Sequence, residues 1–181
     1  MSVRATPVGI AAGIAPRIAL AAAGVAALAA RPVGAPAAWI ALAVGAAALA
    51  WPVVAGPVRP LPWATATIVG SAAFVAVRFS MPGLRLAGGD ATVAIAVVVA
   101  VAEEAFFRRF LYDLAARRGA AMAVAVPAVL FALIHVPLYG AWVLPLDLAA
   151  GLLLGWQRWV AGHWSSPAAT HALANLLAYW R

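Results

Sequence analysis

Cysteine is absent from this 181-residue chain. Its absence excludes disulfide bonds, thiolate metal ligands and a cysteine nucleophile. Lysine is absent too, so all twelve basic residues are arginines, against five acidic residues, and the formal net charge is +7. Charge of either sign is scarce, because only 9% of the residues are charged, whereas a soluble domain has roughly a quarter. So few charges cannot solvate the surface of a water-soluble domain.

Apolar residues make up 67% of the chain and form seven long segments, bounded by Pro, Gly, Arg and Trp. The segments cover residues 8–30, 37–55, 62–79, 91–107, 120–144, 146–160 and 166–180. A helix needs about 20 apolar residues to cross about 30 Å of hydrocarbon. The segments are alanine-rich and lack the period-two alternation of membrane strands. We therefore expect an all-α, polytopic transmembrane helix bundle of about seven membrane segments.

The arginines lie mostly in the breaks between the segments, which fits lipid headgroups rather than nucleic acid. With the N-terminus inside, the cytosolic side receives Arg4, Arg59, Arg108, Arg109, Arg117, Arg118 and Arg158, and the outside receives Arg31, Arg78, Arg85 and Arg181. This bias predicts an N-terminus inside, and the GC-rich composition favours a bacterial cytoplasmic membrane. The first segment also has features of a cleavable signal peptide, although the apolar segments that follow favour a retained helix.

Two adjacent carboxylates, Glu103 and Glu104, follow twelve uncharged residues at the end of the fourth segment. An acidic residue inside a membrane helix costs about 2.5–3.5 kcal/mol on insertion scales, so such residues tend to be paired and functional. Glu104 lies four residues before Arg108, the favourable spacing for an ion pair. Glu103 has no such local partner and is predicted to be a free base. The alternative is that both carboxylates lie at the membrane interface beside Arg108 and Arg109.

Two further segments carry isolated polar residues with helical spacing. Phe131 and His135 lie four residues apart in the fifth segment, and His171 and Asn175 lie four apart in the seventh. A lone histidine in an apolar helix is more often a packed core residue than a catalyst. Three polar clusters on three membrane helices instead indicate that these groups converge in the interior of the bundle.

The helical rise places these groups at similar depths. At 1.5 Å per residue, Glu103 and His135 lie about 21 and 24 Å from the turn at residues 117–119. If the membrane surface lies near Arg108 and Arg109, then Glu103, His135 and His171 lie on the order of 10 Å below the cytosolic face. We therefore expect a cavity that is reached from the side of these arginines, between the fourth and seventh segments.

Together these patterns resemble the three-motif signature of the CPBP family, and they read Glu103-Glu104-x-x-x-Arg108, Phe131-x-x-x-His135 and His171-x-x-x-Asn175. That family comprises type II CAAX prenyl endopeptidases and related bacterial proteins linked to bacteriocin processing or immunity. The resemblance covers about residues 90–181, and Gly151 and Gly155 also fit it. Arg109 departs from it, since bacterial members often have glycine there. Residues 1–90 carry no recognisable motif, which divides the chain into N-terminal transmembrane helices (1–90) and a catalytic bundle (91–181).

The resemblance implies that a peptide bond is hydrolysed inside the bilayer. Glu103 would activate a water as general base with help from His135, and His171 and Asn175 would bind the oxyanion or orient the water. Glu104 belongs to the same set of motif residues, with Arg108 as its structural ion-pair partner. The implied partners are the lipid bilayer and a peptide or membrane-protein substrate, with no nucleic acid.

A metal is the open point of this mechanism, since the family is described both as glutamic proteases and as metalloproteases. If the reaction depends on a metal such as zinc, then Glu103, His135 and His171 would be its ligands, with one position open. No His-Glu-x-x-His pairing is present, which favours a metal-independent reaction.

Two other classes of function compete with a protease on this scaffold. One is a non-enzymatic immunity or assembly factor, and the other is a proton-coupled transporter.

Overall fold

The computed structural model describes residues 7–31, 35–52, 61–80 and 89–179, and these residues form helices and short connections without strands. The helices in chain order are α1 (Pro7–Ala29), α2 (Ala35–Leu49), α3 (Trp63–Ser80), α4 (Asp90–Glu104), the π-helical η1 (Ala105–Leu111), α5 (Tyr112–Ala115), the 3-10 helix η2 (Ala116–Arg118), α6 (Ala120–Tyr139), the 3-10 helix η3 (Ala141–Val143), α7 (Leu144–Ala161) and α8 (Ser165–Tyr179). Four of the arginines that were assigned to one side of the membrane lie outside the described residues: Arg4, Arg59, Arg85 and Arg181.

Most predicted segments correspond to one helix, and two of them differ. The predicted segment 120–144 divides at Gly140, whose φ of 90° ends α6 and separates it from η3. The helical stretch observed at the predicted segment 91–107 is longer than the prediction, because α4, η1, α5 and η2 follow one another from Asp90 to Arg118 without a gap. The π-helical turns of η1 begin directly after the two glutamates, and such turns often occur at functional sites.

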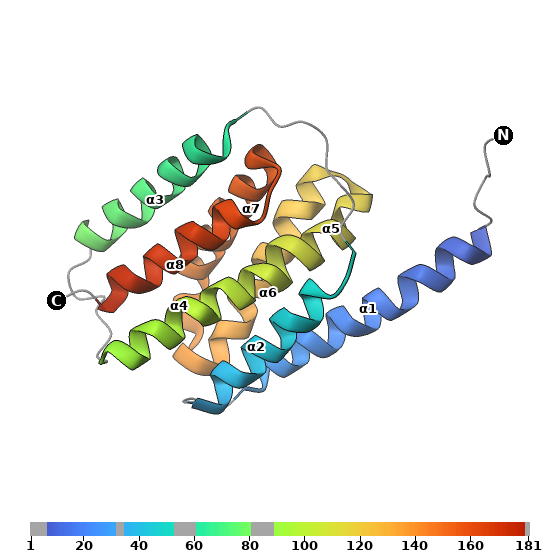
Figure 1. The fold of residues 1–181 in the computed structure, drawn as a ribbon, viewed down its shortest axis with the longest axis horizontal. Helices are drawn as coiled ribbons and strands as arrows, with labels where there is room; N and C mark the ends of the chain where they lie inside the picture. The colour runs from blue at the N-terminus through green and yellow to red at the C-terminus, as the bar shows by residue number, and fades with distance from the viewer. Residues whose placement is uncertain (1–6, 32–34, 53–60, 81–88, 180–181) are drawn as a thin grey trace.

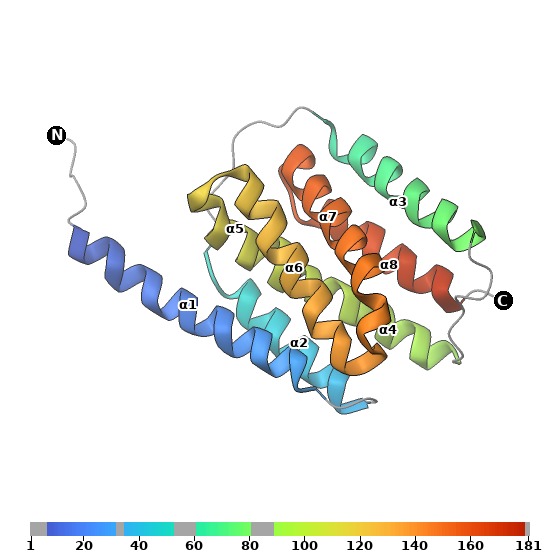
Figure 2. The same ribbon diagram turned by 180° about the vertical axis from the view of Figure 1, so that it is seen from behind.

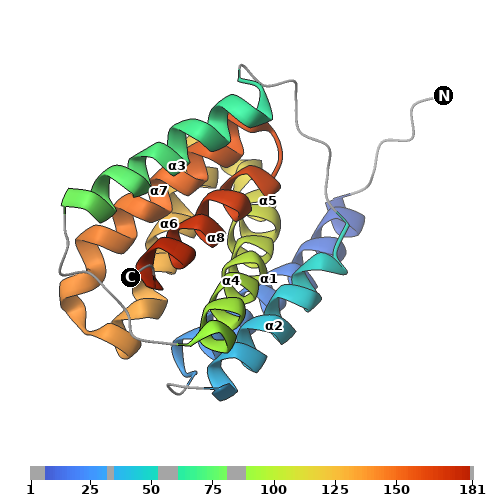
Figure 3. The same ribbon diagram turned by 60° about the vertical axis from the view of Figure 1, so that its left-hand side comes forward.

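The helices pack in two layers (Figures 1 and 2). One layer has the order α3, α8, α4, α2, and the other has the order α7, α6, α1, with neighbours in each layer in direct contact. Figure 3 shows α4 and α8 in the middle of the molecule, with α1 and α2 on one side and α3 and α7 on the other. Helices α4, α6 and α8 are therefore the central ones, and they are the helices that carry the three sequence patterns.

Glycines allow the central helices to approach their neighbours closely. A Cβ added to Gly45 on α2 would lie 2.8 Å from the backbone of Ala102 on α4. A Cβ added to Gly151 on α7 would lie 2.9 Å from Cα of Ala128 on α6. Small residues let helix backbones pack tightly in membranes, where apolar burial against lipid contributes little. These contacts fix the positions of α4 and α6 relative to the outer helices.

The outer surface of the bundle is apolar. On α3, the side chains of Ile68 and Phe79 are 67% and 76% exposed, and large exposed apolar surfaces mark contact with lipid or a partner. Among the described residues, α3 and α6 are long and apolar enough to cross a membrane. The helical bundle is thus confirmed, whereas the number of seven membrane segments stays a prediction.

The stretch after the glutamates lies inside the bundle rather than at its surface. Six of the seven residues of η1 are buried, and Arg108 is fully buried. Arg158 is buried as well, and its Nε donates to the carbonyl of Arg108 at 3.0 Å. Burial inside the bundle does not locate the membrane, so the membrane surface near Arg108 and Arg109 stays a prediction. Since Arg108 and Arg158 are interior residues, they do not count as loop charges, and the N-terminus-inside orientation stays a prediction.

Candidate active site

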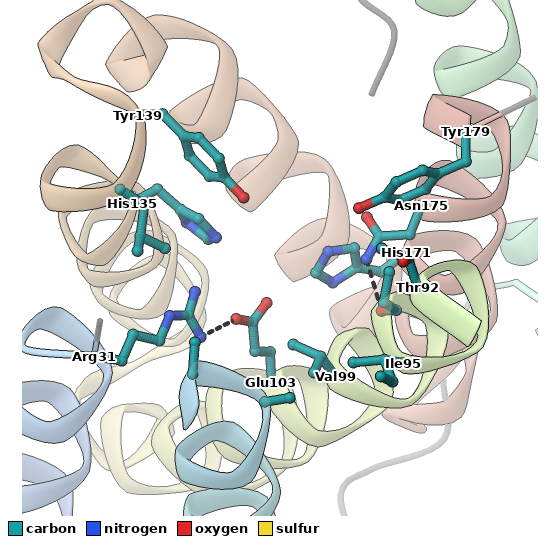
Figure 4. Close-up of a pocket in the computed structure, with 14 residues that line it drawn as sticks. Arg31, Thr92, Ile95, Val99, Glu103, His135, Tyr139, His171, Asn175 and Tyr179 are labelled. Atoms are coloured by element: carbon teal, nitrogen blue, oxygen red, sulfur yellow. Dashed lines mark hydrogen bonds and ion pairs between the residues drawn. The ribbon is translucent and has the colours of Figure 1, made fainter. Parts of the chain in front are cut away.

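A cavity of about 510 Å³ lies among α4, α6 and α8, within the size range of ligand sites in proteins. Glu103, His135, His171 and Asn175 all line it, and Figure 4 shows their side chains pointing toward one another. Glu103 is 3% exposed, and His135 and His171 are each 8% exposed. The predicted convergence of the three patterns in the bundle interior is therefore what the structure shows, and these three side chains do not lie on the outer surface.

Glu103 has a partner that the sequence analysis did not assign to it. Nη1 of Arg31 donates to Oε1 of Glu103 at 2.6 Å, and both side chains are 4% exposed. The prediction that Glu103 is a free base is wrong in this respect. Arg31 was expected to be an external loop charge, but it is buried and lines the cavity. A buried carboxylate requires a partner, and this requirement was the signal available for finding Arg31.

The end of α1 delivers Arg31 to the cavity through close packing. Leu28 is 1% exposed and belongs to the hydrophobic core together with Phe106 and Phe107. A Cβ added to Gly24 would lie 2.5 Å from the ring of Phe106, so α1 approaches η1 as closely as its backbone permits. Arg31 lies just beyond this anchored stretch, two residues past the end of α1.

His135 presents one ring nitrogen to the cavity. Its Nδ1 lies 2.8 Å from the carbonyl oxygen of Phe131, one turn earlier on α6. Because a carbonyl only accepts, this contact requires the proton on Nδ1, which leaves Nε2 for the cavity. Oδ2 of Asp147 lies 3.7 Å from the same Nδ1, in the first turn of α7. The imidazole ring of His135 also lies 4.6 Å from the Phe131 ring, which restricts its rotation.

His171 is held in a similar way, by a carboxylate instead of a carbonyl. Its Nδ1 lies 2.9 Å from Oε1 of Glu104. With Nδ1 donating to this carboxylate, the ring presents Nε2 to the cavity, as a base when the ring is neutral and as a donor when it is protonated. The Phe131 ring lies edge-on to His171 at 5.6 Å and so contacts both histidines.

Glu104 forms the predicted ion pair with Arg108. Nη1 of Arg108 donates to Oε1 of Glu104 at 2.8 Å, and both side chains are fully buried. Nη2 of Arg108 donates to the carbonyl of Gly151 at 3.2 Å, and its guanidinium lies 4.6 Å from the centre of the Phe131 ring. Glu104 does not line the cavity. Its place in the site is therefore to hold His171, rather than to face a substrate.

Asn175 lies one turn after His171 on α8 and lines the cavity. Its Nδ2 donates to the carbonyl of Ala96 on α4 at 2.9 Å. This amide has two N–H groups and one carbonyl oxygen, so one N–H and the oxygen are left for the cavity. The bond to α4 fixes the direction in which these groups point.

The cavity extends in the direction opposite to the one expected. From Glu103 it runs toward the beginning of α4, past Val99 and Thr92, and toward the ends of α6 and α8 at Tyr139 and Tyr179. Arg108, Arg109 and Arg158 do not line it. The prediction that the cavity opens on the side of these arginines is wrong, because η1 and its aromatic side chains fill the bundle there. The expected passage between the fourth and seventh segments is present, since residues of α4 and α8 form two of its walls.

The described side chains are not gathered into a metal site in this structure. Among the described residues, no three His, Asp or Glu side chains lie close enough together to hold a metal ion. Oε1 of Glu103 is engaged by the guanidinium of Arg31, a cation that would repel a metal at the same carboxylate. The conditional ligand set of Glu103, His135 and His171 therefore stays untested, and the chemistry below uses the side chains alone.

The comparison with known proteins agrees with the site. Residues 91–177 match the family model described as type II CAAX prenyl endopeptidase Rce1-like. This range runs from the start of α4 to the last turns of α8 and includes all three sequence patterns. No curated protein and no solved structure matches the chain. The match confirms the resemblance that the three patterns predicted: residues 91–177 are similar to the Rce1-like family of type II CAAX prenyl endopeptidases.

Proposed function

We propose that this chain is an intramembrane endopeptidase that hydrolyses a peptide bond with a water activated by Glu103. The observation that carries the proposal is the cavity, in which one carboxylate and two imidazole Nε2 atoms from three helices face the same space. The family match supports a peptidase of the CAAX-protease type in a lipid environment. A bacterial cytoplasmic membrane with the N-terminus inside is part of the proposal.

Glu103 is the proposed general base. Its Oε1 is occupied by Arg31, and its Oε2 accepts no hydrogen bond from the described residues and points into the cavity. Oε2 takes a proton from water while the water oxygen bonds to the carbonyl carbon of the substrate. When the C–N bond breaks, the same proton passes to the leaving amine. Base catalysis of this kind contributes about 10²–10⁴-fold to the rate.

His171, with its ring protonated, and Asn175 are the proposed donors to the oxyanion of the tetrahedral intermediate. Both come from α8 and line the same cavity, and each is fixed by a bond to another residue, His171 to Glu104 and Asn175 to the carbonyl of Ala96. Donors that are fixed before the reaction stabilise the developing charge without a cost of reorganisation. His135, on the other side of Glu103, is proposed to hold the attacking water through Nε2.

The cavity also bears on the two alternative functions. A scaffold or immunity factor would be expected to pack its polar groups against one another, whereas Glu103, His135 and His171 border about 510 Å³ of space. A proton-coupled transporter needs access from both faces. Apart from Glu103, His135 and His171, the residues that line the cavity lie toward a single end of the bundle. The opposite end is filled by η1. Both observations favour the protease.

The experiment uses the full chain in liposomes with two quenched fluorescent peptides that end in a CAAX sequence, one farnesylated and one not. We expect the wild type to cleave at least one of them and Glu103→Gln to lose about 10²–10⁴-fold in kcat. Gln at this position still accepts the hydrogen bond from Arg31, and the melting temperature in detergent checks that the variant is folded. In parallel, membrane proteomics of cells that carry Glu103→Gln or His171→Ala should identify substrates that accumulate.

Arg17→Met is the matched control, because Arg17 lies on α1 far from the cavity and contacts Trp51 and the carbonyl of Pro52. A folded Glu103→Gln protein that cleaves the peptides, and leaves the membrane proteome unchanged, would rule out the protease and favour a scaffold function.

A further inference from the structure

Arg31 lines the cavity but belongs to none of the three sequence patterns. It precedes Glu103 by 72 residues and lies outside the range matched by the family model. Its side chain and that of Glu103 are each 4% exposed, so the ion pair is shielded from bulk water. In such an interior the cost of desolvating two charges largely offsets their attraction, so the pair by itself is weak evidence of a stabilising role.

The contact between the two side chains engages a single carboxylate oxygen. Nη1 of Arg31 bonds Oε1 of Glu103 at 2.6 Å, whereas arginine–carboxylate pairs in general are frequently bidentate. Oε2 of Glu103 is left for the cavity, on the side of His135 and His171 (Figure 4). Nε of Arg31 is buried and has no hydrogen-bond partner among the residues that the structure describes. The guanidinium thus restrains the carboxylate without covering the oxygen that faces a substrate.

Arg31 is also the permanent cation in direct contact with Glu103. The other charged or titratable groups that interact with Glu103 come from η1, α6, α7 and α8, and are Arg108, His135, Tyr139, Asp147 and His171. Arg108 is engaged by Glu104 and by the carbonyl of Gly151. The two histidines carry charge only when protonated. Arg31 is therefore a partner of Glu103 whose positive charge does not depend on the protonation of the two histidines.

We propose that Arg31 is a positioning residue for hydrolysis: it keeps the Glu103 carboxylate charged, and it directs Oε2 toward the attacking water. This inference rests on the proposed function. It connects the N-terminal helices to the reaction, because Arg31 is placed by the packing of Leu28 and Gly24 against η1. Arg31 does not bind a substrate carboxylate in this arrangement, since such a group would lie beside the negative charge of Glu103.

The test compares Arg31→Met and Arg31→Lys with the Arg17→Met control, using the CAAX peptide that the wild type cleaves. Met keeps the length of the side chain and removes the charge. We expect Arg31→Met to lower kcat by about tenfold or more near neutral pH, with KM changed by less than about twofold because the effect is not on substrate binding. The acidic limb of the kcat profile should move up by about one to three pH units, because Glu103 loses the cation that favours its charged form. Arg31→Lys should bring the acidic limb most of the way back to its wild-type position on the pH axis.

A second measurement does not depend on activity. Infrared difference spectra of the protein in nanodiscs report the C=O band of a protonated carboxyl group. Arg31→Met should show this band near neutral pH, and the Arg31→Met, Glu103→Gln double variant should lack it. The double variant removes both charges and so distinguishes a loss of folding from a loss of positioning.

The outcomes separate the inference from the proposed function. A folded Arg31→Met protein with the wild-type pH profile and no new infrared band overturns the inference, as does a rise in KM with kcat unchanged. If instead Glu103→Gln is as active as the wild type, the proposed function fails. The infrared band then still decides whether Arg31 keeps Glu103 charged.

Discussion

The two faces of α8 contain polar residues that differ in what they contact. His171 and Asn175 face the cavity, and each leaves polar atoms for a substrate. Thr170, the residue before His171, faces the other way. It belongs to a polar seam between α3, α7 and α8 that consists of Thr67, Ser71, Gln157, Ser166 and Thr170. In this seam, Gln157 donates from Nε2 to Oγ1 of Thr170 and to the carbonyl of Ala66, each at 2.8 Å.

The polar seam is closed by bonds among its own members. The hydroxyl of Thr67 on α3 donates to Ser166 on α8 at 2.9 Å, and the hydroxyls of Ser71 and Thr170 lie 3.3 Å apart. Gln157 and Ser166 are fully buried. In a membrane such bonds hold helices together, and here they attach α3, which is largely exposed on its other faces, to the rest of the bundle.

The difference shows how a structural polar group can be told from a functional one in this protein. Both sets are buried, both lie on membrane helices, and both are spaced by helical turns. The seam residues bond mainly to one another, whereas the cavity residues are held by one atom and present another to open space. Burial alone does not distinguish them; the direction of the remaining atoms does.

The largest effect on the reaction, after Glu103→Gln, is expected from Asn175→Ala. Loss of one oxyanion donor costs about 10²–10³-fold in kcat, or about 2.7–4 kcal/mol. Because Asn175 also bonds the carbonyl of Ala96, the melting temperature serves as the check on folding. A variant with unchanged kcat would mean that Asn175 only joins α8 to α4, in the manner of the seam.

The largest effect on stability is expected from Arg108→Ala. This change leaves the fully buried Glu104 without its arginine, and breaking a buried pair from one side costs about 3–5 kcal/mol. Unfolding by detergent titration measures the loss. Replacing both members, as Glu104→Met with Arg108→Met, should cost less, since no charge is left unpaired. Unchanged stability and expression of Arg108→Ala would contradict the structural role assigned to this pair.

A smaller effect on stability is expected from Gln157→Ala in the seam. Removing its two hydrogen bonds leaves the carbonyl of Ala66 and the hydroxyl of Thr170 with fewer partners, at a cost of about 1–3 kcal/mol. The kcat per folded molecule should equal that of the wild type, because Gln157 does not line the cavity. A loss of kcat as large as that of Asn175→Ala would remove the distinction between the two faces of α8.

Much of the architecture could be predicted because it depends on local patterns. Apolar segments at residues 8–30, 62–79 and 166–180 became α1, α3 and α8 within one residue at each end. The Glu104–Arg108 pair follows from a spacing of four residues on one helix. The motif residues could be identified because isolated polar residues in membrane helices are costly and therefore informative.

Other features could not be read from local patterns. The sequence did not predict that η1, directly after Glu104, is π-helical, and the wider turns of a π-helix change where the following side chains point. The expectation that Arg108 is a surface charge treated charge as a sign of exposure, whereas Arg108 is fully buried. Arg109 instead donates to the carbonyls of Ala48 and Trp51 at the end of α2, so its charge is used inside the fold.

The sequence by itself determined the helical class, the apolar exterior, the residues that converge in the interior and the ion pair within one helix, because each depends on composition or on spacing within a few turns. Only the tertiary structure decided that Arg31 reaches Glu103 and that the cavity opens toward the beginning of α4. The first depends on how closely α1 packs against η1 at Gly24 and Phe106, and the second on η1 and its aromatic side chains, which fill the other end of the bundle. Contact between residues far apart in the chain is set by the fit of whole helices, which no local spacing encodes.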